Sequence, residues 1–222
     1  MIIGNGLIAK ALESIDSEDI LLFASGVSNS LETKESEFNR EFNLLKNTLA
    51  NHQEKKLIYF STLSINDSSK QNSHYIQHKL KIEVYIQNHC KEYLILRLGN
   101  IVGYGGNPNT LFNFLKHKII LNDVFVLHTN ARRLLTDIND ISDFLEIHGE
   151  NIRNQIKNFA YPYYYDLKEI VRAIEEKIGK EAVYKKVNEG DYYKIAFDND
   201  VESYFNKINS NEYLQALVNK YI

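Results

Sequence analysis

Short apolar runs alternate along the chain with longer amphipathic stretches. The runs lack the apolar–polar alternation of a half-exposed strand, so they favour strands buried on both faces of a parallel sheet: Met1–Ile3, Ile20–Ala24, Leu57–Phe60, Tyr93–Leu98 and Val124–Leu127. The amphipathic stretches carry apolar residues at steps of three and four and favour helices: Leu7–Leu12, Glu35–Asn51, Tyr75–His89, Thr110–Lys118 and Ile141–Ile147. This order predicts an α/β fold, a Rossmann-like, doubly wound parallel sheet with right-handed crossovers.

The pattern changes after about residue 150, where tyrosines become frequent and the helical stretches dominate. Helices are expected there at Leu167–Ile178, Val201–Ile208 and Glu212–Ile222. No linker rich in Ser, Gly or Pro divides the chain. We therefore expect one compact protein in which residues 1–150 form a Rossmann-like domain and residues 151–222 form a small, helix-rich cap.

Composition narrows the class of protein. The chain has 222 residues, of which 44% are hydrophobic, enough for a sizeable core. Its 26 basic and 29 acidic residues give a net charge of −3, which favours neither nucleic acid nor an anionic membrane as a partner. No apolar run reaches the roughly 18–20 residues of a membrane span, and the start of the chain lacks the features of a secretory signal. The only cysteine, Cys90, excludes an internal disulfide and a thiolate metal cage. We expect a cytoplasmic protein.

A glycine turn lies between the first expected strand and the first expected helix. Gly4, Gly6 and Ala9 form the pattern G-x-G-x-x-A. The first glycine permits a tight turn, the second leaves room for a pyrophosphate, and the small third residue lets the helix pack close to the strand. The pattern indicates a dinucleotide site, although a tight turn without a ligand is the alternative. The acidic residue expected about 20 positions on is absent, because the next strand runs into the sequence SGVS.

Tyr75 and Lys79 lie one turn apart on one face of an expected helix. An ammonium beside a phenol stabilises the phenolate, so Lys79 is expected to lower the pKa of Tyr75 from about 10 toward neutrality. Thr62, at the end of the preceding strand, is placed to hydrogen-bond the same oxygen. Such a trio exchanges a proton with a substrate hydroxyl while a nicotinamide takes or gives hydride. The alternative is a surface pair, and Tyr164 and Lys168 share the spacing by coincidence.

These features together resemble the extended short-chain dehydrogenase/reductase family, the epimerase/dehydratase group that acts on nucleotide sugars. Residues 96–103 (LRLGNIVG) are similar to the family's LR..N..G stretch, and residues 133–140 (RLLTDIND) to its R-x-F-x-x-V-x-D segment. Residues 19–25 are similar to its central strand, and residues 57–65 to the strand that carries its catalytic Ser or Thr. The resemblance extends over nearly the whole chain.

The resemblance implies a set of roles. Tyr75 is the acid/base, Lys79 also contacts the nicotinamide ribose, and Thr62 binds the reacting oxygen. Asn100 and Arg133 contact the nucleotide-sugar substrate. NAD or NADP is the implied cofactor, held by Gly4, Gly6, Ala9, Ala24, Ser25 and Lys79, and no metal is required. The family also suggests a role in polysaccharide biosynthesis and a homodimer formed through the helices Glu35–Asn51 and Tyr75–His89.

The chain also departs from the family. If residues 19–25 are the family's fourth strand, the second and third strands are absent between Glu13 and Asp19, and the adenosine half of the cofactor site is truncated. Leu63 and Ser64 replace the acidic pair of the sugar 4,6-dehydratases, which excludes that branch. We expect 4-keto reduction or 4-epimerisation. The alternative is a degenerate member that binds a sugar nucleotide or a protein without redox chemistry.

His74 and His78 are four residues apart and have the spacing of a metal-chelating pair on one helical face. No third ligand has a supporting spacing. We therefore interpret both histidines as solvated helix residues.

Overall fold

The computed structural model describes residues 1–190 and 192–222. The chain forms two compact units, one of residues 1–98 and 138–159, the other of residues 99–137 and 160–222. This division differs from the predicted boundary at residue 150. The chain leaves the first unit after residue 98 and returns to it for one helix and one strand, so neither unit is a continuous segment.

The first unit contains a five-stranded parallel sheet in the order β1-β2-β3-β4-β9. Its strands are β1 (Ile2–Ile3), β2 (Ile20–Phe23), β3 (Lys56–Thr62), β4 (Tyr93–Leu98) and β9 (Gln155–Phe159). The predicted α/β class with a parallel, Rossmann-like sheet is confirmed. Among the described residues no strand pairs with the outer side of β1.

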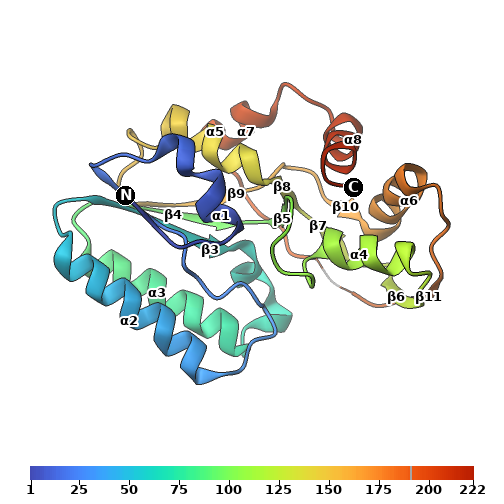
Figure 1. Cartoon of the computed structure of the whole chain (residues 1–222), viewed down its shortest axis with the longest axis horizontal. Coiled ribbons are helices and arrows are strands. Elements are labelled where there is room, and N and C mark those ends of the chain that lie inside the picture. The colour runs from blue at the N-terminus through green and yellow to red at the C-terminus, as the bar shows by residue number, and fades with distance from the viewer. Residues whose placement is uncertain (191) are drawn as a thin grey trace. The chain divides into compact units, whose positions relative to one another are not determined.

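Helices cover both faces of this sheet (Figure 1). α2 (Glu35–Asn51) and α3 (His74–His89) lie side by side on one face, and α1 (Leu7–Ala11) and α5 (Ile138–His148) lie on the other. Short 3-10 turns are η1 (Glu13–Ile15), η2 (Leu63–Asn66) and η3 (Ser68–Lys70). The core beneath α2 and α3 holds fully buried side chains that each stabilise the fold by roughly 1.5–3 kcal/mol, among them Leu21, Leu45, Leu57, Ile82, Ile86 and Ile95.

The second unit is built on three short strand pairs. β5 (Asn100–Val102) pairs in parallel with β8 (Leu135–Asp137), β6 (Phe125–His128) in parallel with β11 (Tyr184–Val187), and β7 (Arg132–Arg133) antiparallel with β10 (Tyr165–Asp166). Its helices are α4 (Leu111–Ile120), α6 (Leu167–Ile178), α7 (Asn199–Phe205) and α8 (Ser210–Tyr221).

The prediction that residues 124–127 form a strand of the main sheet, buried on both faces, is wrong. A strand does form there as β6, but it belongs to the second unit and pairs with β11. Val126 is 49% exposed, so this strand is not buried on both faces. The fifth strand of the main sheet is β9, whose sequence QIKNF carries polar residues between its apolar ones.

Candidate functional site

In the turn after β1, the first glycine is required because the backbone after β2 passes close to it. Gly4 has φ +135°, and a Cβ atom there would lie 2.5 Å from the carbonyl oxygen of Ala24. The amide of Ala24 in turn donates to the carbonyl of Ile3 at 2.8 Å. Gly4 and Ala24 are therefore brought together, and only glycine satisfies this approach.

The second glycine of the turn borders open space. A Cβ atom on Gly6 would meet nothing within 4 Å, and Ala9 is buried where α1 packs against the unit. Ser25, half-buried, follows Ala24 after β2. The open space at Gly6 is what a pyrophosphate at this turn would require.

Tyr75 lies in the first turn of α3, and Thr62 is the last residue of β3. The Thr62 hydroxyl lies close enough to the Tyr75 phenol to favour its ionised form, and it accepts the backbone N–H of Ser64 at 3.1 Å. The Tyr75 ring packs with Val27 and Ile65 in a small apolar cluster and is 8% exposed. The structure therefore brings together the two hydroxyl groups singled out in the sequence.

Lys79 follows one turn later and is buried. Its Nζ lies 5.8 Å from the centre of the Tyr75 ring. It donates hydrogen bonds to the Tyr59 hydroxyl at 2.8 Å and to Glu41 Oε1 at 3.0 Å. The ammonium thus lies beside Tyr75, as the helix spacing requires, but it is also paired with a carboxylate on another helix.

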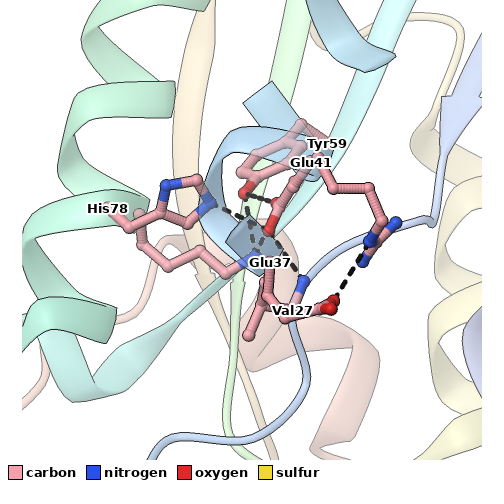
Figure 2. Close-up of polar contacts among 7 residues, drawn as sticks. Val27, Glu37, Glu41, Tyr59 and His78 are labelled. Carbon is pink, nitrogen blue, oxygen red and sulfur yellow. Dashed lines mark hydrogen bonds and ion pairs between the residues drawn. The ribbon is translucent and has the colours of Figure 1, made fainter. Parts of the chain in front are cut away.

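That carboxylate, Glu41 of α2, is completely buried. Its Oε1 accepts hydrogen bonds from Tyr59 and Lys79, and its Oε2 accepts the backbone N–H of Val27 at 2.7 Å and contacts His78 Nε2 at 3.0 Å. Figure 2 shows Tyr59, His78 and Val27 converging on it. We refer to Glu41, Tyr59, His78, Lys79 and the Val27 amide as the Glu41 network.

The interpretation of His78 as a solvated residue is wrong, because its ring is buried against Glu41. The sequence analysis also missed Glu41 and Tyr59. A signal for Glu41 was present, because it lies three residues after Phe38 and four before Leu45, within the apolar stripe of α2.

Burial and charge set the pKa values of these groups. Burial alone would raise the pKa of Glu41, but the Lys79 ammonium and the hydrogen bonds from His78, Val27 and Tyr59 hold it well below its ordinary value. Burial alone would lower the pKa of Lys79, because it disfavours the charged ammonium. The Glu41 carboxylate outweighs this effect, and the pKa of Lys79 is raised above its ordinary value. The pair is therefore charged at neutral pH.

The expectation that Lys79 brings the Tyr75 pKa toward neutrality is wrong. Burial raises the pKa of Tyr75 above its ordinary value and the Glu41 charge raises it further, while Lys79 and Thr62 oppose this without reversing it. The main physical reason is the burial of the phenol, and a second is that the ammonium is paired with the Glu41 carboxylate. Tyr75 is therefore a neutral phenol at neutral pH.

A second buried acid, Glu83, lies on α3 one turn beyond Lys79. Its Oε1 accepts from the Ser61 hydroxyl at 2.6 Å, and Arg97 of β4 donates to both carboxylate oxygens at 3.1 and 2.6 Å. These contacts join α3 to β3 and β4.

The two residues expected to contact substrate, Asn100 and Arg133, both belong to the second unit. The Asn100 side chain donates to the carbonyl of Leu134 at 3.1 Å, and its backbone N–H donates to the same oxygen at 2.8 Å. Arg133 precedes Leu134 and donates from Nη1 to the carbonyl of Arg132 at 2.8 Å. Both side chains are half-buried, and the contact with Leu134 brings Asn100 to the segment that carries Arg133.

The same unit contains an apolar cavity of about 340 Å³ between α4, β6 and α6. Phe114, Phe125 and Leu167 are among its lining residues, and His128 supplies a polar ring. Within the described residues, no three His, Cys, Asp or Glu side chains gather as a metal ion would require. None of the described helices has the length and apolar character needed to cross a membrane.

No protein-family model matches the chain, and no curated protein matches it. Solved structures are similar to it along most of its length. The Bordetella bronchiseptica enzyme WbmH in complex with NAD+ shares 15% identity over 99% of this chain and 80% of that chain, with a TM-score of 0.73. The UDP-glucuronic acid 4-epimerase of Bacillus cereus, in complex with UDP-glucuronic acid and NAD, shares 18% identity over 96% and 76% of the two chains, with a TM-score of 0.72.

RMD from Pseudomonas aeruginosa, complexed with NADPH, shares 12% identity over 98% of this chain and 87% of that chain, with a TM-score of 0.70. At such identities the likeness concerns the fold. The chain has the Rossmann-like architecture of these enzymes.

Proposed function

We propose that this chain is an NAD(P)-dependent enzyme that reduces or epimerises a nucleotide-activated sugar at Thr62, Tyr75 and Lys79. The observation that carries the proposal is that the Thr62 hydroxyl and the Lys79 ammonium both lie near the Tyr75 phenol and favour its ionised form, with Lys79 Nζ 5.8 Å from the ring centre. The solved structures of similar fold, which contain NAD or NADPH, support it.

In this proposal the phenol of Tyr75 transfers a proton to or from a sugar oxygen that the Thr62 hydroxyl also binds. The raised pKa of Tyr75 keeps the phenol protonated at neutral pH, which suits a group that donates its proton to a ketone oxygen. Lys79 stabilises the phenolate that remains. A bound dinucleotide would supply or accept the hydride. The protonated phenol favours 4-keto reduction over oxidation of a hydroxyl group.

The remaining predicted residues bind the two ligands. Gly6 leaves room for the cofactor pyrophosphate, with Gly4, Ala9, Ala24 and Ser25 shaping the turn. In the second unit, Asn100 and Arg133 bind the sugar nucleotide, and a guanidinium suits its diphosphate because it donates two parallel hydrogen bonds. The apolar cavity between α4, β6 and α6 is suited to the face of a nucleobase or sugar ring. We also expect a homodimer through α2 and α3.

A second candidate function is the binding of a sugar nucleotide without redox chemistry. The observation that favours it is the pairing of Lys79 with Glu41, which leaves the ammonium buried and shared. A ribose hydroxyl would then have only the remaining N–H of Lys79 as a partner.

Ligand-induced stabilisation separates the two functions. The melting temperature of the chain is measured with NAD, NADP and a series of UDP- and dTDP-sugars, because a ligand at 100 times its Kd adds about 2.7 kcal/mol of stability. An enzyme is expected to respond to a dinucleotide and to a sugar nucleotide. A response to a sugar nucleotide but to neither dinucleotide would favour the binding protein and contradict the proposed enzyme.

A further inference from the structure

The hydrogen-bond partners of the Lys79 ammonium lie on other elements than its own helix. Two of its three N–H donors point to Glu41 and Tyr59 at 3.0 and 2.8 Å. Because both acceptors are buried on α2 and β3, they fix where the ammonium lies relative to the Tyr75 ring.

The other oxygen of Glu41 holds the loop that follows β2. It accepts the N–H of Val27, whose side chain packs against Tyr75. The preceding residue, Gly26, lies so close that a Cβ atom would be 2.9 Å from Lys79 Nζ and 3.2 Å from Glu41 Oε1. The loop therefore lies against the ion pair at Gly26, where a larger residue would have to displace the Lys79 ammonium.

We propose that Glu41 is a positioning residue of this site, which holds the Lys79 ammonium beside Tyr75 and ties the Gly26–Val27 loop to both. This inference rests on the proposed function, because it concerns the same Tyr75 and Lys79. It adds a residue of α2 that the Thr-Tyr-Lys pattern does not include. Glu41 acts through Lys79 and the loop and has no contact with substrate in this proposal.

The charged and titratable groups around Tyr75 come from several elements. Lys79 and His78 share its helix, Glu41 comes from α2, and Tyr59 comes from β3. Glu83, also on α3, acts on Lys79 and Tyr59 through its charge. Of these acids, only Glu41 contacts Lys79 directly among the hydrogen bonds of the described residues.

The test follows Tyr75 itself in the ligand-free chain. The protein is labelled at the tyrosine Cζ with carbon-13, the Tyr75 signal is identified by its loss in Tyr75→Phe, and its ionisation is followed by NMR as pH rises. In Glu41→Gln the ammonium is expected to lose its anchor and move away from the phenol, so the midpoint is expected to move to higher pH, because Lys79 favours the phenolate more than Glu41 opposes it. A move to lower pH, which is the effect of the lost negative charge alone, would show that Lys79 stays in place without Glu41 and would overturn the proposal. Hydrogen exchange of the Val27 amide is expected to become faster in the same variant.

The control is Glu37→Gln. Glu37 is one turn earlier on α2, half-exposed, and forms its own ion pair with Arg40 at 3.2 Å (Figure 2). The Glu37→Gln variant is expected to leave the Tyr75 midpoint and the exchange rate of the Val27 amide at their wild-type values. An unmoved Tyr75 midpoint in a folded Glu41→Gln protein, or an equal shift in the control, would overturn the proposal.

If Glu41→Gln does not fold, the double variant Glu41→Gln with Lys79→Met removes both buried charges and is expected to fold. Tyr75 should then ionise at higher pH than in the wild type, because Lys79 favours the phenolate more than Glu41 opposes it. An unchanged midpoint would contradict the inference. Because no ligand is present, these results are independent of whether the chain binds a dinucleotide, which the melting experiment decides separately.

Discussion

Glu41 and Glu83 are both buried in the first unit, and each is paired with a cation. Glu83 is joined by two parallel hydrogen bonds to Arg97, whose side chain is 20% exposed, and by one from Ser61. Glu41 is joined to Lys79, whose side chain is 3% exposed. One pair therefore reaches water through a broad, planar group, whereas the other is enclosed.

The two pairs consequently differ in what they do. The hydrogen bonds of Glu83 connect α3 to two strands and involve neither Thr62 nor Tyr75. The Glu41–Lys79 pair has a compact ammonium near the Tyr75 ring. Lysine is a compact point charge, whereas arginine is a planar fork that matches a carboxylate with two parallel hydrogen bonds. The comparison teaches that what separates the two buried ion pairs is the neighbour of the cation, because only the Lys79 cation lies near the Tyr75 phenol among these contacts.

The largest expected effect tests whether Tyr75 is the reactive group. Tyr75→Phe removes the proton that is transferred, and turnover of a sugar-nucleotide substrate is expected to fall by about 10²–10⁴-fold. Dinucleotide affinity should be retained, since the ring remains. Tyr85→Phe, on the same helix but stacked on His89, is the matched control and should retain activity. Steady-state kinetics measures turnover, and calorimetry measures dinucleotide affinity. Full turnover by Tyr75→Phe would show that Tyr75 is not the reactive group.

The next effect concerns stability. Glu41→Ala leaves the Lys79 charge buried without its partner, and the free energy of unfolding is expected to fall by about 3–5 kcal/mol. Glu83→Ala should cost less, because the Arg97 guanidinium is close enough to water to be solvated. Urea unfolding of both variants measures the difference. Equal losses would mean that the two ion pairs do not differ in enclosure as described.

Acid pH provides a third, smaller effect. The pKa of Glu41 lies well below its ordinary value of 4.5, so its contribution to stability is complete above that pH and is lost as pH falls through the lower, folded-state pKa. The free energy of unfolding of the wild type should therefore decline below about pH 4.5. Glu41→Gln, which has no carboxylate to protonate, should decline less. Parallel pH profiles of the two proteins would refute this assignment.

The smallest effect belongs to the exposed pair Glu37–Arg40. Both side chains are about half in water, and Glu37→Gln should change the free energy of unfolding by less than about 1 kcal/mol. The measurement is urea unfolding at low and high salt. A larger loss would show that the α2 surface, and not the buried carboxylate alone, matters for the first unit.

The sequence predicted those elements whose apolar residues repeat at helical or strand spacing. The bounds of α2 and α6 agree with the prediction, because their stripes are regular and α6 begins with an Asp166–Glu169 capping box and ends at Gly179. β9 was missed because Lys157, a residue that rarely enters a core, is buried within it.

Thr62, Tyr75 and Lys79 were singled out from the sequence, whereas Glu41 and Tyr59, which contact Lys79, were not. Tyr75 and Lys79 are adjacent on α3, so their spacing in the sequence places them together. Glu41 is 38 residues from Lys79, and nothing in the sequence pairs a carboxylate of one helix with an ammonium of another. The error in the expected Tyr75 pKa follows first from the burial of the phenol, which the helix spacing does not reveal, and then from this missing partner.

The path of the chain between the two units has a consequence for biosynthesis. β4 pairs with β9 along its length, yet residues 99–137 of the second unit are made between them. During translation from the N-terminus, β4 can pair with β3, but its other edge has no partner until residue 159 has left the ribosome. A nascent chain stalled before that point exposes the β4 edge to other chains, and truncation at residue 98 cannot yield a closed first unit.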